Sequence, residues 1–349
     1  MNFKKKIWLP CAVIAAFLIW LSYTNDNNIN PPTKDLIIPE EIDEQEIIDE
    51  FNIHQAEHPL IEQVVYEEYM LEQDYIEQDN FNPSLCDLTQ WKEYQKEALP
   101  EVINNLSDEY QPYKVVVSED FIITMYSANM TSYFEKQFTL LMKGVLASYT
   151  NYLNIDLTNK IHLHMIISQN RQSYLVQAGI DGFNPSRSQG VYFGQRNLAF
   201  VSYHNEEQAI KTAIHEAVHA INLHLVGITS RSFSEGTAEF FEDISMTDEN
   251  QFRVLISNKK LTTEPYLFSL IIKDDEWKNL DIPKLYYSSW AWLSFMMMEF
   301  DAKSTLQSYL VKEQENLCSA LSEEEVLSLW RESYIQFESD FWTWLDLDY

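Results

Sequence analysis

The stretch that decides the fold is His215-Glu216-Ala217-Val218-His219, which reads H-E-x-x-H inside an apolar-periodic run from about Glu206 to Leu225. On a helix, His215 and His219 lie one turn apart and share a face, so both imidazoles can bind one zinc ion from the same side. Glu216 lies roughly 100° around the helix, too far round to join the histidines as a ligand. It is near enough to reach a water bound to the metal, an arrangement typical of a zinc-dependent hydrolase.

A second helix is expected soon after the first, with Ser234 as its N-cap residue. Glu235 and Glu239 are four residues apart and share a face of this helix. Catalytic zinc sites usually have three protein ligands and one open position, and two histidines with a glutamate are a standard set. We predict Glu235 as the third ligand and Glu239 as the acceptor of a hydrogen bond from a ligand imidazole.

The spacing alone also allows Glu239 to be the ligand. A competing interpretation is that both carboxylates are ordinary acids near a helix N-terminus, where the helix dipole favours negative charge. That interpretation explains Glu235 better than Glu239.

The two motifs together resemble the gluzincin clan of metallopeptidases, and within it the peptidase MA-like family of uncharacterised bacterial proteins. Members of that family carry H-E-x-x-H followed by an E-G-x-A-E-Y-F-E-like helix, which reads E-G-T-A-E-F-F-E here, with Phe240 where tyrosine is usual. The resemblance covers roughly residues 113–300. Two flanking stretches are also similar to the family: Gly190-Val191-Tyr192 and Tyr286-Tyr287-Ser288-Ser289-Trp290.

The resemblance implies an α+β fold: a gluzincin-like metallopeptidase domain with a small mixed sheet, zinc-site helices and a helical C-terminal part. It implies that Glu235 binds the zinc and that Glu239 orients a ligand histidine. It also implies an oxyanion donor on a later helix, for which Tyr286 is the candidate and Tyr287 its rival. A hairpin of Gly190–Phe193 and Leu198–Tyr203 would supply the sheet edge that pairs with an extended peptide.

The expected reaction is hydrolysis of a peptide bond by a zinc-bound water whose pKa falls towards about 7. Zn²⁺ would be held by His215, His219 and Glu235. Glu216 would take the proton of the water as general base and deliver it to the leaving amine, and Tyr286 would stabilise the oxyanion. The alternative is a catalytically weak or inactive, membrane-anchored peptide-binding or scaffold protein that retains the zinc fold. The intact Glu216 argues against it, because a binding module needs no base.

Residues 1–25 have the pattern of a targeting segment. Lys4, Lys5 and Lys6 precede an apolar run, Ile7–Tyr23, which predicts a signal anchor, or else a cleaved signal peptide. The rest of the chain would then lie on the extracytoplasmic side, periplasmic or extracellular. It would be anchored to the membrane through this segment only, or secreted if the segment is cleaved.

Residues 26–90 have a different composition from the rest, because no lysine or arginine occurs between Lys34 and Lys92 while acids are dense. We predict an acidic helical stalk that acts as a spacer, with a partner-binding arm or a prosegment over the site as the alternatives. Residues 91–349 are the predicted metallopeptidase-like domain.

The net charge of -30 excludes nucleic acid as a partner, because such binding needs clustered lysine and arginine. Cys86 and Cys318 fit no metal-binding spacing. They either form a disulfide in an oxidising compartment or remain free thiols. On a predicted strand, Lys160–Ile167, His162 and His164 point to one side, and we interpret them as a polar sheet face and not as a second metal site.

Overall fold

The computed structural model describes residues 35–38 and 98–346, apart from residues 158–159, 181, 248–250 and 256–263. The predicted targeting segment and most of the predicted stalk lie outside the described residues. Within the described part of the chain, no helix combines the length and apolarity that crossing a membrane requires.

The main sheet has five strands, and the chain is a mixed α/β structure. The strand order is β2-β3-β4-β6-β5, with parallel pairing at β3–β4 and β4–β6 and antiparallel pairing at both edges. The strands are β2 (Gln111–Val116), β3 (Phe121–Ser127), β4 (Ile161–Ser168), β5 (Gly190–Phe193) and β6 (Leu198–Ser202). The predicted hairpin of β5 and β6 is confirmed, and β5 is an edge strand of this sheet.

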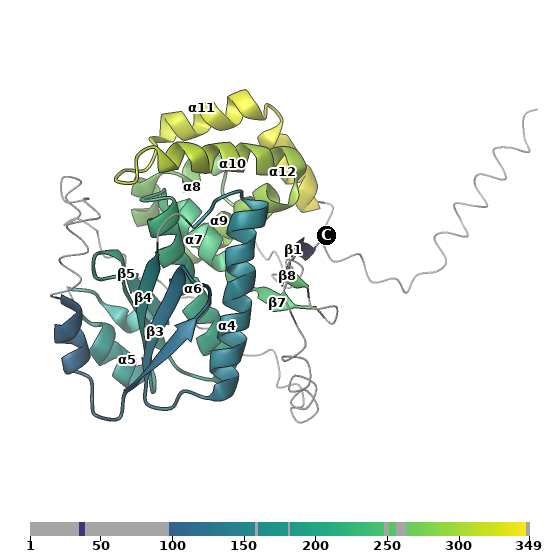
Figure 1. Ribbon diagram of the computed structural model, residues 1–349. Coiled ribbons are helices and arrows are strands. Elements are labelled where there is room, and N and C mark those ends of the chain that lie inside the picture. Colours follow the sequence, from purple (N-terminus) through teal and green to yellow (C-terminus); the bar gives the residue numbers. More distant parts are fainter. Residues whose placement is uncertain are drawn as a thin grey trace, which may run out of the picture. The chain divides into compact units, whose positions relative to one another are not determined.

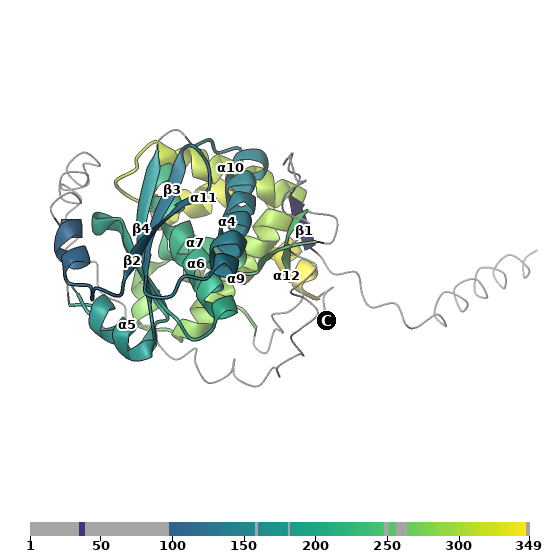
Figure 2. The same cartoon turned by 60° about the horizontal axis from the view of Figure 1, so that its bottom comes forward.

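Helices cover both faces of the main sheet (Figure 1, Figure 2). Alternate residues of β4, such as Leu163 and Met165, pack into the larger core with α4 (Ser132–Ala147) and α6 (Glu206–Leu225). Ile166, on the opposite face, packs with α5 (Arg171–Ala178) in a smaller core. The period of two along the strand therefore sorts side chains between two helical layers.

A second, three-stranded sheet has the order β1-β8-β7 and consists of β1 (Asp35–Ile38), β7 (Ile244–Met246) and β8 (Phe252–Leu255). β1 pairs antiparallel with β8, with Asp35 opposite Leu255 and Ile38 opposite Phe252. β1 belongs to the residues 26–90 that the sequence predicts as a stalk. At least these four residues therefore pair with a strand of the predicted domain.

The part of the chain after β6 is mainly helical, as expected. In α9, apolar and small residues are buried nearly all round, and Pro283 stands in its first turn, where a missing N–H costs nothing. The helices that follow α6 are α7 (Arg231–Glu242), α8 (Phe268–Ile271), α9 (Ile282–Met298), α10 (Phe300–Gln314), α11 (Glu323–Ser333) and α12 (Phe337–Asp346). Short turns of 3₁₀ or π type occupy Ser148–Tyr152, Pro185–Arg187, Gly194–Arg196 and Asp274–Lys278.

One cysteine lies among the described residues. Cys318 is disulfide-bonded, whereas Cys11 and Cys86 fall outside the described residues. A disulfide at Cys318 is consistent with an oxidising compartment.

Candidate metal centre

The H-E-x-x-H motif lies in the middle of α6, which has the predicted bounds Glu206–Leu225. Asn205 caps the helix by accepting the N–H of Gln208 with its side chain. α6 packs against β5, β6 and α7. His215 and Glu216 are consequently only 7% and 4% exposed. Polar side chains buried to this degree need partners or a function.

The second motif lies on α7, but its position in the helix differs from the prediction. α7 begins at Arg231, and the side chain of Ser230 accepts the N–H of Phe233, so the prediction of Ser234 as the N-cap is wrong. Glu235 is the fifth residue of the helix, and the first turn contains no acid. The helix dipole, which falls off within the first turn, therefore gives a weaker explanation of Glu235 than the sequence suggested.

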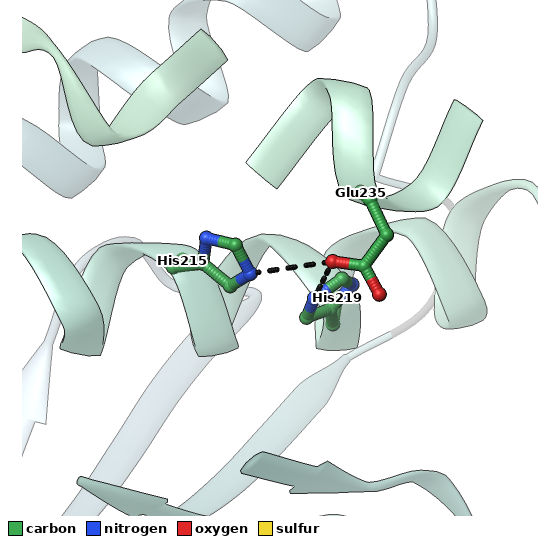
Figure 3. A group of neighbouring side chains, drawn as sticks. All are labelled: His215, His219 and Glu235. Carbon is green, nitrogen blue, oxygen red and sulfur yellow. Dashed lines mark ion pairs between the residues drawn. The ribbon is translucent and has the colours of Figure 1, made fainter. Parts of the chain in front are cut away.

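α6 and α7 bring three side chains to one point (Figure 3). The Nε2 atom of His215 lies 3.6 Å from Oε2 of Glu235, and the Nε2 atom of His219 lies 3.5 Å from the same oxygen. The candidate ligand atoms of these three residues all lie within 4.8 Å of one another. They form a group that is able to hold a metal ion.

The spacing of these atoms fits a shared metal better than it fits direct hydrogen bonds. The two N–O distances exceed the usual N–H···O range, which ends at about 3.2 Å. Among the described residues, Oε2 of Glu235 is buried and accepts no hydrogen bond. A tetrahedral zinc with bonds of about 2.1 Å places its ligand atoms about 3.4 Å apart. The donor set of two imidazoles and one carboxylate is also one that zinc accepts.

Charge within the group is strongly coupled. Burial lowers the pKa of His215, but the surrounding carboxylates, Glu235 first among them, raise it to about 10. Burial acts in the opposite direction on Glu235, yet His219, His215 and Arg231 hold the pKa of its carboxyl well below its usual range. Without a metal, Glu235 is therefore ionised and His215 carries a proton.

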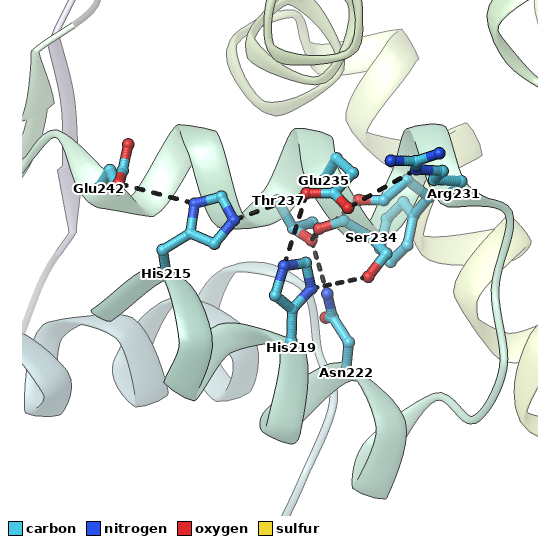
Figure 4. A network of polar contacts seen from close by, with 9 residues as sticks. His215, His219, Asn222, Arg231, Ser234, Glu235, Thr237 and Glu242 are labelled. Carbon is cyan, nitrogen blue, oxygen red and sulfur yellow. Dashed lines mark hydrogen bonds and ion pairs between the residues drawn. The ribbon is translucent and has the colours of Figure 1, made fainter. Parts of the chain in front are cut away.

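The second ring nitrogen of each histidine faces a different residue of α7 (Figure 4). The Nδ1 atom of His219 lies 2.9 Å from the hydroxyl of Ser234. The Nδ1 atom of His215 lies 3.7 Å from Oε1 of Glu242. Glu239, predicted for the orienting role, is buried and forms a second group with His215 and Glu242, whose candidate ligand atoms also lie within 4.8 Å of one another.

Sequence reasoning missed Ser234 and Glu242 as neighbours of the imidazoles. The available signal was the seven-residue spacing from Glu235 to Glu242, which is close to two helical turns and puts both carboxylates on one face. Which acid lies nearest a given ring nitrogen depends on how α7 is rotated against α6. Its approach to α9 at Gly236, where a Cβ would lie 2.7 Å from the carbonyl oxygen of Ser289, constrains that rotation.

Glu216 lies between α6 and the edge strand β5. A Cβ atom at Gly190 would overlap Oε1 of the Glu216 carboxylate, so only glycine allows β5 to come this close. Burial raises the pKa of Glu216, while the charges of His215 and His219 act to lower it. A carboxylate that is buried, next to a sheet edge and adjacent in sequence to a candidate metal ligand can serve as a base.

Tyr286 is buried on α9, and its ring meets that of Trp277 edge to face at a centroid distance of 5.6 Å. Its hydroxyl forms a side-chain hydrogen bond with Arg231. Burial, with the negative charge of Glu235 second, raises the pKa of Tyr286 well above its ordinary value. Tyr287, the rival candidate, is partly buried and lies 5.8 Å from Trp290, ring to ring.

His162 and His164 lie outside this centre on β4. Their rings stack on each other at a centroid distance of 4.6 Å, and Nε2 of His162 lies 2.8 Å from the hydroxyl of Thr124 on β3. Burial, with a smaller effect of the neighbouring His162, lowers the pKa of His164 to about 4. His162 is exposed and His164 is partly buried, while the residues between and beside them, Ile161, Leu163 and Met165, are buried, which agrees with the predicted polar sheet face.

No protein-family model matches the chain, and a search of the curated proteins finds no match.

Proposed function

We propose that this chain is a zinc-dependent peptidase, in which His215, His219 and Glu235 hold Zn²⁺ and Glu216 is the general base. The observation that carries the proposal is the convergence of three candidate ligand atoms on one point, with Oε2 of Glu235 facing the Nε2 atoms of both histidines. The resemblance of both motifs to the gluzincin clan supports the same assignment, including the α+β metallopeptidase type of domain.

When bound, zinc supplies Lewis-acid chemistry, which makes a water more acidic and a carbonyl carbon more electrophilic. In this proposal Glu216 receives the proton of that water. Its position one residue after His215, with its carboxylate next to Gly190 of the edge strand β5, supports this role. Its burial raises its pKa, which makes the carboxylate a stronger base and, once protonated, a competent acid towards the leaving amine.

The substrate class is an extended peptide or protein segment. β5 is an edge strand and lies against α6 beside Glu216, so a peptide that paired with β5 would pass next to the base. The contact of Tyr286 with Arg231 favours a supporting role at Glu235, in place of the oxyanion role that the sequence suggests. The extracytoplasmic location stays a prediction that the disulfide at Cys318 supports.

The alternative is an inactive peptide-binding or scaffold protein that keeps the same zinc centre without catalysis. Such a protein has no need of a carboxylate buried between α6 and the sheet edge, and burying one carries a desolvation cost. The position of Glu216 therefore favours the peptidase.

The test is Glu216→Gln in the purified chain, assayed for zinc content and for cleavage of a proteome-derived peptide library. We expect unchanged zinc content and loss of cleavage, because glutamine keeps the shape but not the basicity of the carboxylate. Glu207→Gln, an exposed position on the same helix, is the matched control and should behave as wild type. Cleavage by Glu216→Gln at the wild-type rate would refute the mechanism.

A further inference from the structure

Arg231, four residues before Glu235 on α7, is a buried cation next to the proposed centre. Its side chain is 9% exposed, and its Nε atom lies 3.9 Å from Oε1 of Glu235. An arginine is rarely buried without a partner, because removing its charge from water is costly. An ion pair at this distance recovers only part of that cost, so the stability of the fold is a weak reason to keep it.

Three further residues hold the guanidinium in place. Its Cζ atom lies 4.4 Å from the centroid of the Trp277 ring, and the Trp277 indole in turn donates its N–H to the carbonyl of Ile271 at 2.8 Å. The Tyr286 hydroxyl accepts a side-chain hydrogen bond from Arg231. The carboxylate of Asp274 interacts with both the backbone and the charge of Arg231. The position of the Arg231 side chain is therefore set by contacts that do not involve Glu235.

The two oxygens of Glu235 are divided between different partners (Figure 4). Oε1 faces Arg231, and Oε2 faces the Nε2 atoms of His215 and His219. A carboxylate on a long side chain is otherwise free to rotate about its last torsion, which is broad. The charge of the fixed guanidinium favours the orientation in which Oε1 faces it, and this leaves Oε2 directed at the imidazoles.

We propose that Arg231 is a positioning residue for Glu235: held by Trp277 and Tyr286, its positive charge attracts Oε1, so that Oε2 is the oxygen presented to the metal. This inference rests on the proposed function, since it gives Glu235 a metal to bind. It also supports Glu235 as the third ligand, because Oε2 of Glu235 faces the Nε2 atoms of both histidines while Oε1 faces Arg231. Residues that orient a metal ligand in this way typically contribute roughly 10–100-fold to metal affinity.

The experiment compares Arg231→Met and Arg231→Lys with wild type, using the whole chain. Arg331→Met, an exposed arginine on α11, is the matched control for the loss of one positive charge. Zinc affinity is measured by competition with a chromogenic chelator. The visible spectrum of the Co²⁺-substituted protein reports the geometry of the ligand set. Thermal denaturation without metal shows whether each variant is folded.

We expect Arg231→Met to weaken zinc binding roughly 10–100-fold and to change the Co²⁺ spectrum. Arg231→Lys keeps the charge but loses the planar fork and the stacking, so its loss should be smaller. Arg331→Met should match wild type in both measurements. A change in the Co²⁺ spectrum separates a positioning role from simple destabilisation, which leaves ligand geometry unaltered.

A folded Arg231→Met that binds zinc as tightly as wild type, with the same Co²⁺ spectrum, would overturn the proposal. If Arg231→Met fails to fold, the zinc affinities of Arg231→Lys and Tyr286→Phe test the proposal in its place. Weaker zinc binding in both would support the proposal, and wild-type binding in both would overturn it. Failure of the proposed function is distinguishable, because wild type itself would then bind neither zinc nor Co²⁺.

Discussion

Replacing Gly190 by alanine tests the proposed place of the general base. The new Cβ would overlap Oε1 of Glu216 and would lie 2.9 Å from its Cδ atom, while Thr212 blocks it from another side. Carbon–carbon contacts in proteins are most favourable at about 3.5–4.0 Å. The carboxylate of Glu216 must therefore move by on the order of 1 Å, or β5 must move away from α6.

The size of the effect follows from that displacement. A misplacement of about 1 Å in a catalytic group can lower the rate about 10²-fold. Inserting a methyl group into a packed site typically costs about 1–3 kcal/mol of unfolding free energy. Zinc affinity should stay within about twofold of wild type, because Glu216 is not a proposed ligand and the proposed ligands lie elsewhere on α6 and α7.

The assay combines three measurements on Gly190→Ala: cleavage of a peptide library, denaturant unfolding and zinc competition. Val191→Ala is the control on the same strand, since its side chain packs on the opposite face with the smaller core. Cleavage by Gly190→Ala at the wild-type rate would refute the placement of the base beside β5. Loss of zinc together with cleavage would instead show that the substitution disturbs the proposed metal ligands.

Three further predictions concern α6 and α7. Asn222→Ala removes a buried amide whose oxygen accepts from Tyr149 at 2.5 Å and whose nitrogen donates to Thr237 at 2.6 Å. The unfolding free energy, measured with urea, should therefore fall by about 3 kcal/mol; a loss under about 1 kcal/mol would contradict a stabilising role of these two bonds. In metal-free protein, burial lowers the pKa of His215 but carboxylates raise it to about 10 from 6.5. The charge of His215 therefore stabilises the fold fully below pH 6.5, and this stabilisation is lost as the pH rises towards 10. Zinc affinity should increase over the same interval, because zinc must displace the proton of His215. A zinc affinity that does not change with pH would argue against His215 as a ligand. Glu242→Gln should weaken zinc binding by roughly tenfold, more than Glu239→Gln does, because Glu242 lies next to Nδ1 of His215. If competition with a chelator shows the larger loss for Glu239→Gln, Glu239 is the residue that orients a ligand histidine, as the sequence predicts.

The elements that the sequence predicts well are those decided by local periodicity. The bounds of α6 follow from a continuous apolar stripe with Asn205 before it, and the hairpin of β5 and β6 from two short apolar runs around Gly194–Arg196. The positions of His215 and His219 on one face follow from the helical repeat alone. Local sequence therefore determined the part of the site that lies within one helix.

The start of α7 was harder to predict, because Ser230 and Ser234 are both acceptable N-caps. The intervening residues, Arg231 to Phe233, extend the helix and place Arg231 one turn before Glu235. The choice between the two serines depends on tertiary contacts of Arg231, which the sequence pattern does not contain.

Long-range pairings account for the remaining differences. β1 and β8 are joined by a register between Asp35 and Leu255, far apart in sequence, so no local pattern marks either strand as the partner of the other. The stacking of Arg231 on Trp277 likewise joins α7 to a 3₁₀ turn that precedes α9. Contacts of this kind constrain the rotation of α7, and this rotation determines which of Glu239 and Glu242 lies nearest Nδ1 of His215.

The most direct test of the central claim is the metal content of the purified chain, measured by elemental mass spectrometry alongside His215→Ala and Glu235→Ala. The proposed function predicts one zinc per wild-type chain and its loss in both variants, with each variant still folded. A folded wild-type protein that contains no zinc, and takes up none when zinc is added, would contradict the claim.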